Sequence, residues 1–191
     1  MKRLAWMALL ACLIPTACTL GGGRESSRDT TTVEPAPAPP PPGLERRIGI
    51  YSSVIRQLVT EDHTFGGADP GFKVVYVLDG ALKGAERTLL REPPPEEPFG
   101  EELKTGLQDD LVDLPDLVFV RDRSSVLRKD GQVRNRGVLL TLGPIEGNKR
   151  RAEVGSNLWV AGKGAIWQTY VVKNRASRWV VTGTTGWMAI S

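Results

Sequence analysis

The fold class of this chain is set by residues 138–190, VLLTLGPIEGNKRRAEVGSNLWVAGKGAIWQTYVVKNRASRWVVTGTTGWMAI. This stretch is rich in β-branched and aromatic residues, and apolar residues alternate with polar ones, which is typical of half-buried strands. Three turn sequences interrupt it: EGNK, GKG and NRAS. The Gly-Asn pair in the first suits the positive φ of a tight turn. The pattern predicts an antiparallel meander with strands over 138–145, 150–161, 165–173 and 178–184, and a final strand over 187–190.

The residues before this meander predict two helices and two short strands. Apolar residues at helical spacing predict an amphipathic helix over 44–61. The sequence KVVYVL predicts a strand over 73–78. Leucines spaced three or four residues apart predict a helix over 101–114, and a short strand follows over 117–120. This order predicts one α+β domain over 44–191, in which the helices pack on one face of a curved antiparallel sheet.

The first 18 residues predict an export signal that ends at a cysteine. The charged start MKR precedes an apolar run that is shorter than the roughly 20 residues of a membrane-spanning helix. Residues 14–18, IPTAC, resemble a lipobox, and the resemblance implies that Cys18 receives fatty-acyl chains such as palmitate and anchors the chain. Residues 9–12, LLAC, offer Cys12 as an alternative, and cleavage or retention without lipidation is a third. The residue after Cys18 is not Asp, which by resemblance to diderm lipoproteins permits the outer membrane.

Residues 19–43 predict a tether between this signal and the domain. The segment starts with glycines and polar residues and ends in PAPAPPPP at 35–42. Such a run favours polyproline II, at about 3.1 Å per residue. Both cysteines of the chain precede the tether. The domain therefore contains no disulfide, no cysteine metal ligand and no cysteine nucleophile.

Charge is divided unevenly along the predicted domain. Residues 44–116 contain 8 Lys and Arg against 15 Asp and Glu, whereas residues 117–191 contain 13 against 4. The basic residues around a predicted hairpin turn at Asp130-Gly131 are Arg121, Arg123, Arg128, Lys129, Arg134 and Arg136. A second basic group, residues 149–151, lies at another hairpin. Two interpretations stay open: the halves attract each other within a solvated surface, or the basic residues bind an anionic polymer or lipid headgroups.

The sequence offers few residues for catalysis. His63 is the single histidine, and with Asp62 or Asp79 it can form an acid–base pair in a cleft between helix and sheet. The alternative is that His63 ends the first helix, where its ring suits the terminal carbonyls. No serine-nucleophile motif and no phosphate-loop spacing is present, and one histidine without cysteine does not predict a metal site. We expect no cofactor.

Two tryptophans of the meander are candidate binding residues. Trp159 falls on the strand face opposite to Leu158 and Val160, and Trp167 lies on the next strand. An indole pair in a concave cleft can stack on a sugar or hold an apolar ligand. Packing in the core is the alternative interpretation.

The element order over most of 44–191 resembles the cystatin-like or NTF2-like α+β group. The segments DHTFG, VYVLD, VLLTLGPI and WVVTGTTGWMAIS are similar to a group of uncharacterised bacterial exported proteins. These resemblances imply an extracytoplasmic protein with a sheet-and-helix fold and supply no functional residue. The leading hypothesis is a non-catalytic, membrane-anchored envelope lipoprotein that binds a partner protein, a glycan or a polyanion, with no nucleic-acid partner. The alternatives are a small hydrolase or isomerase that uses His63, and a structural or assembly protein of the envelope.

Overall fold

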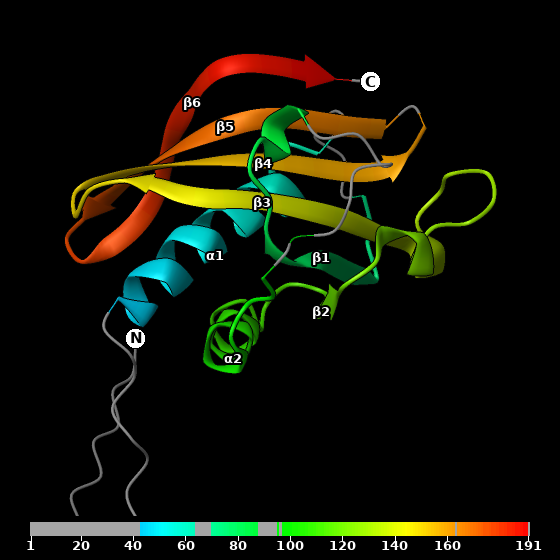
Figure 1. Ribbon diagram of the computed structural model, residues 1–191, viewed down its shortest axis with the longest axis horizontal. Helices are drawn as coiled ribbons and strands as arrows, with labels where there is room; N and C mark the ends of the chain where they lie inside the picture. The colour runs from blue at the N-terminus through cyan, green and yellow to red at the C-terminus, as the bar shows by residue number, and fades with distance from the viewer. Residues whose placement is uncertain (1–42, 64–69, 88–94, 96, 163, 191) are drawn as a thin grey trace, which may run out of the picture. The chain divides into compact units, whose positions relative to one another are not determined.

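The computed structural model describes residues 43–63, 70–87, 95, 97–162 and 164–190. The predicted signal with Cys18, and the tether except Gly43, lie outside the described residues. These residues form two α-helices and six strands, which are labelled in Figure 1. Their bounds are α1 Leu44–Thr60, β1 Val74–Ala81, α2 Glu101–Asp110, β2 Asp116–Val120, β3 Gly137–Gly147, β4 Arg151–Ala161, β5 Gly164–Arg175 and β6 Arg178–Ile190. Neither of these helices is long and apolar enough to cross a membrane.

The six strands form one open, curved sheet in the order β2-β1-β3-β4-β5-β6. Strands β3 to β6 are antiparallel neighbours, as the meander predicted. However, β1 is parallel to both β2 and β3, so the prediction of a wholly antiparallel sheet is wrong. Parallel neighbours need long crossover connections. The segment with α2 connects β1 to β2, and residues 121–136 connect β2 to β3.

The predicted and observed boundaries differ most at two places. The strands expected over 178–184 and 187–190 form a single strand, β6, whose pairing with β5 shifts register twice. Gly183 and Gly186 within it have φ angles of 152° and 75°, which glycine adopts without steric cost and which let the strand bend without ending. Helix α2 ends at Asp110, although Leu111 after it is still buried.

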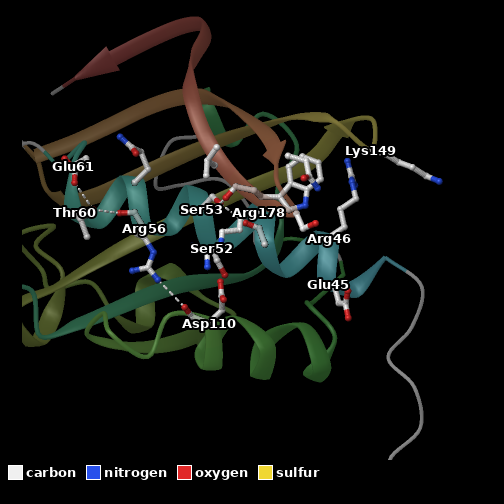
Figure 2. A pocket seen from close by; sticks show the side chains of 16 residues that line it. Glu45, Arg46, Ser52, Ser53, Arg56, Thr60, Glu61, Asp110, Lys149 and Arg178 are labelled. Carbon is white, nitrogen blue, oxygen red and sulfur yellow. Dashed lines mark hydrogen bonds between the residues drawn. The ribbon is translucent and has the colours of Figure 1, made fainter.

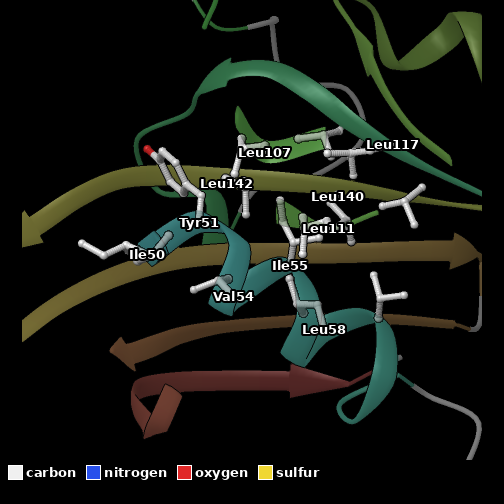
Figure 3. Close-up of a cluster of buried hydrophobic side chains, with 14 of the residues drawn as sticks. Ile50, Tyr51, Val54, Ile55, Leu58, Leu107, Leu111, Leu117, Leu140 and Leu142 are labelled. Atoms are coloured by element: carbon white, nitrogen blue, oxygen red, sulfur yellow. The ribbon is translucent and has the colours of Figure 1, made fainter. Parts of the chain in front are cut away.

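The larger hydrophobic cluster joins both helices to one set of sheet side chains (Figure 3). From α1 it takes Ile50, Val54, Ile55 and Leu58, from α2 it takes Leu103 and Leu107, and from the sheet it takes Val75, Leu140, Leu142, Val154 and Tyr170. Each fully buried aliphatic side chain of this size contributes about 1.5–3 kcal/mol. The cluster therefore supplies most of the driving force that a domain without disulfides needs.

A smaller cluster covers the opposite face of the sheet. It contains Val74, Tyr76 and Leu139, and these alternate along their strands with the residues of the larger cluster. Val126 and Val133, from the connection between β2 and β3, complete the cluster. The connection is thus packed on the sheet through apolar side chains, although most of its residues are polar or charged.

Candidate functional site

The connection between β2 and β3 presents a group of exposed cations, which we call the loop patch. Its members are Arg121, Arg128, Lys129, Arg134 and Arg136. Arg123 was predicted with them but is only 5% exposed, so it does not belong to this surface. The structure therefore brings five of the six predicted basic residues onto one segment that solvent reaches.

Hydrogen bonds close a turn within this connection. Leu127 and Val133 form an antiparallel bridge. Inside it the amide of Arg128 donates to the Gln132 carbonyl at 2.8 Å, and the amide of Gly131 donates to the Arg128 carbonyl at 3.0 Å. The predicted hairpin around Asp130-Gly131 is thereby confirmed as a short, bridged turn.

Contacts with the sheet anchor the same segment. The indole N–H of Trp159 donates to the Gly131 carbonyl at 2.9 Å, and the amide of Val133 donates to the Val160 carbonyl at 2.9 Å. Further along, the Asn135 side chain donates to the Tyr76 hydroxyl at 2.8 Å. The cations are consequently displayed on a positioned support rather than on a free loop.

Few carboxylates oppose this positive charge. The carboxylate of Asp122 accepts hydrogen bonds from the amide and hydroxyl of Ser124 at 2.8 and 2.7 Å, and these bonds lower its pKa. Asp130 lies 4.0 Å from Arg128 and accepts from the amide of Gln132. Both acids of the connection thus stabilise its turns through hydrogen bonds. An anionic ligand would therefore meet a surface with net positive charge.

The two predicted tryptophans meet on the same side of the sheet as the loop patch. Their ring centroids are 6.1 Å apart at 74°, an edge-to-face arrangement that favours both rings. Trp167 is only 9% exposed, and the indole N–H of Trp159 is engaged with Gly131. The pair supports the loop, which agrees with the packing interpretation better than with an open platform for a sugar.

A groove of about 900 Å³ runs along α1 beside the start of β6 (Figure 2). Near the start of the helix it is lined by Arg46, Lys149 and Arg178. The Arg46 guanidinium lies 5.5 Å from the centroid of the Trp179 ring. A Cβ at Gly49 would lie 2.8 Å from this ring, so glycine is what lets the indole pack directly on the helix backbone.

The groove is one feature that the sequence analysis did not identify. The guanidinium of Arg46 donates to the carbonyl of Asn148, which is 102 positions further along the chain. No spacing rule connects residues so far apart. The sequence does contain one signal of this surface. Each of the two turns 146–149 and 174–177 contains a basic residue, and alternate turns of a meander lie at the same end of its strands.

Asp62, proposed as a partner of His63, belongs to a polar cluster between α1 and β5. One carboxylate oxygen accepts from the Tyr170 hydroxyl at 2.8 Å, from Gln57 at 3.2 Å and from Gln168 at 3.3 Å. Burial and the Asp62 charge raise the pKa of Tyr170 above its usual value. His63 itself is 7% exposed. The Asp62 carboxylate therefore has a structural task, because it ties the end of α1 to the sheet.

Asp79, the other suggested partner, has different neighbours. Its carboxylate accepts from the amide of Phe99 at 3.0 Å and lies 3.5 Å from the Lys104 ammonium. These contacts hold the start of α2 against the end of β1. The two carboxylates thus belong to separate clusters, and neither His63 nor Asp79 lines the α1 groove.

The described parts of the chain contain no group of three or more His, Cys, Asp or Glu side chains arranged to hold a metal ion. What the arrangement provides is positive charge at two places, and carboxylates of Asp62 and Asp79 that accept hydrogen bonds from neighbouring elements. Positive charge of this kind attracts anions, and this attraction needs no catalytic group. Comparisons of this chain with protein-family models, with characterised proteins and with solved structures found no match.

Proposed function

We propose that this chain is a non-catalytic, extracytoplasmic lipoprotein module whose loop patch binds an anionic glycan polymer of the cell envelope. The observation that carries the proposal is the set of five exposed cations on one connection that is anchored to the sheet through Trp159 and Val133. Because the backbone of this array is already held in place, binding orders only the side chains, so several weak charge contacts can add up.

The anchoring part of the proposal comes from the N-terminal sequence. Acylation of Cys18 attaches the chain to a membrane, and residues 19–43 act as a spacer. In this proposal the helices cover one face of the sheet, and the face that carries residues 121–136 is turned to the ligand. A cystatin-like or NTF2-like relationship is compatible with this arrangement and is not required by it.

The enzyme alternative has weaker support. Asp62 and Asp79 each accept hydrogen bonds that join secondary-structure elements, and neither residue lines the α1 groove. A glycan rich in phosphate or carboxylate groups is the partner that fits the charge of the loop patch. Nucleic acid has the same charge but belongs to another compartment.

Heparin is a suitable probe, because it is an anionic glycan polymer of high charge density. We expect the full-length chain, with Cys12 and Cys18 replaced by Ser, to be retained on heparin and released by salt, since about 0.15 M salt screens charges beyond 8 Å. The loop variant Arg121→Ala, Arg128→Ala, Lys129→Ala should elute at clearly lower salt.

A variant with the same loss of charge elsewhere is the control. Lys149→Ala, Arg150→Ala, Arg175→Ala removes three exposed cations from other turns and should elute close to the unmodified protein. Equal shifts for both variants would mean that only net charge matters. That result, or no retention of the parent protein, would overturn the proposal.

A further inference from the structure

A second group of cations surrounds the point where the N-terminal segment joins the domain. We call it the basic rim, and its members are Arg46, Arg47, Lys149, Arg150, Arg175 and Arg178. They come from three separate places in the chain: the first turn of α1, the β3–β4 turn and the β5–β6 turn. Figure 2 shows Arg46, Lys149 and Arg178 together at one end of the α1 groove.

Hydrogen bonds join these three elements. Arg46 donates to the carbonyl of Asn148 at 3.1 Å, which connects α1 to the β3–β4 turn. The amide of Asn174 donates to the carbonyl of Arg150 at 3.0 Å, which connects the two turns. The rim is therefore one continuous surface of the fold rather than three independent loops.

The charges of the rim are poorly compensated. Within the described ranges, no ion pair involves five of the six rim residues, which are Arg47, Lys149, Arg150, Arg175 and Arg178. Arg175 also stands directly opposite Arg178 in the β5–β6 pairing. Like charges at directly opposed positions destabilise a sheet. Folding alone does not explain this arrangement, whereas an external anionic surface does.

The position of the rim indicates which surface that is. Gly43, the last tether residue, immediately precedes the helix that carries Arg46 and Arg47. The loop patch lies near the start of β3 and the rim near its end. Because β3 has 11 residues, the two cationic groups are separated by about 35 Å along the strand. Gly43 therefore joins the domain at the rim, near the end of β3 that is opposite to the loop patch.

We propose that the basic rim docks on the anionic headgroups of the membrane that carries the lipid anchor. The inference rests on the anchoring part of the proposed function and is independent of the ligand of the loop patch.

Guanidinium and ammonium groups donate charge-assisted hydrogen bonds to lipid phosphates at the membrane interface. Each cation near such a surface changes partitioning about fivefold. The tether raises the local concentration of the surface, so a weak attraction is sufficient. Docking brings the domain down onto the bilayer and points the loop patch away from it.

The test uses the full-length chain with Cys12 and Cys18 replaced by Ser, together with phosphatidylcholine vesicles with or without phosphatidylglycerol. The apolar N-terminal segment contributes to binding on both vesicles, so the readout is the ratio of the two partition coefficients. We expect a clear preference for the anionic vesicles that falls as salt rises.

The two triple variants separate this proposal from the proposed function. Lys149→Ala, Arg150→Ala, Arg175→Ala should lower the preference for anionic vesicles about 100-fold while heparin retention stays, because three cations are lost from the rim. The loop variant should lose heparin retention while its preference for anionic vesicles stays; it carries Arg121→Ala, Arg128→Ala, Lys129→Ala. All six residues are exposed, and an unchanged thermal midpoint checks that each variant folds.

Two results would overturn the membrane proposal. One is equal binding of the parent protein to neutral and anionic vesicles. The other is a rim variant that loses heparin retention but keeps its vesicle preference, which would make the rim a glycan site. A preference for anionic vesicles without any heparin retention would support the rim proposal and refute the proposal that the loop patch binds an anionic glycan.

Discussion

Replacement of Tyr170 by Phe tests whether the buried polar cluster between α1 and β5 is structural. The Tyr170 side chain is fully buried, and its hydroxyl donates to the Asp62 carboxylate at 2.8 Å. The substitution removes the hydrogen bond to this charged acceptor, together with the one that the hydroxyl accepts from Gln168, and leaves the ring in place. We therefore expect a loss of about 1.5–3 kcal/mol in the free energy of unfolding. For a domain of this size that corresponds to a fall of roughly 3–12 °C in the thermal midpoint.

The same variant should change the response to alkaline pH. Burial and the nearby Asp62 charge raise the pKa of Tyr170, and burial raises the pKa of Tyr51 to about 12. Above pH 10 the unfolded chain releases these phenolic protons while the folded domain keeps them. Stability that is present below pH 10 is therefore lost as pH rises further, by about 1.4 kcal/mol per pH unit for each tyrosine.

Urea denaturation at pH 7 and at several values between pH 9 and pH 11.5 measures both effects. Tyr170→Phe should begin less stable and then lose stability with a shallower alkaline slope than the parent protein. Tyr51→Phe is the comparison, since its hydroxyl donates to the Gly143 carbonyl at 3.1 Å in a different part of the core. A Tyr170→Phe variant within 0.5 kcal/mol of the parent at pH 7, with an unchanged alkaline slope, would refute the reasoning.

Three further substitutions probe the framework around the two cationic surfaces. Gly49→Ala places a methyl group 2.8 Å from the Trp179 ring, and calorimetry should record a loss of about 1–3 kcal/mol as the strand is pushed off the helix. Trp159→Phe removes the N–H that binds the Gly131 carbonyl; we expect about 1 kcal/mol less stability and faster tryptic cleavage in the loop patch. Leu107→Ala empties a fully buried position of α2, which should cost about 2–5 kcal/mol in a urea titration.

Matched controls show whether these effects are local. Val112 is 84% exposed close to α2, so Val112→Ala should lie within 0.5 kcal/mol of the parent. A Cβ at Gly162 meets nothing within 4 Å, and Gly162→Ala should likewise be tolerated. If the exposed and buried substitutions had equal effects, the packing described for α1, α2 and β6 would be incorrect.

The candidate binding surfaces were predictable only in part. The group from Arg121 to Arg136 lies within one short segment, so its charge is visible in the sequence. Its support by Trp159 is not, because the indole and Gly131 are 28 positions apart and meet only when β4 has paired with β3. The burial of Arg123 depends in the same way on how the connection lies on the sheet.

The local elements of this protein follow from its amino-acid sequence. The periodicity of apolar residues set α1 and the antiparallel meander, because a helix and a half-buried strand expose their faces at different intervals. The direction of β1 between β2 and β3 came only from the folded arrangement, because the unbroken apolar run VVYVL indicates a strand that is buried on both faces but does not identify its neighbours. Only the tertiary structure joined Arg46, Lys149 and Arg178, because pairing of distant strands, and not spacing along the chain, brings their turns to one edge.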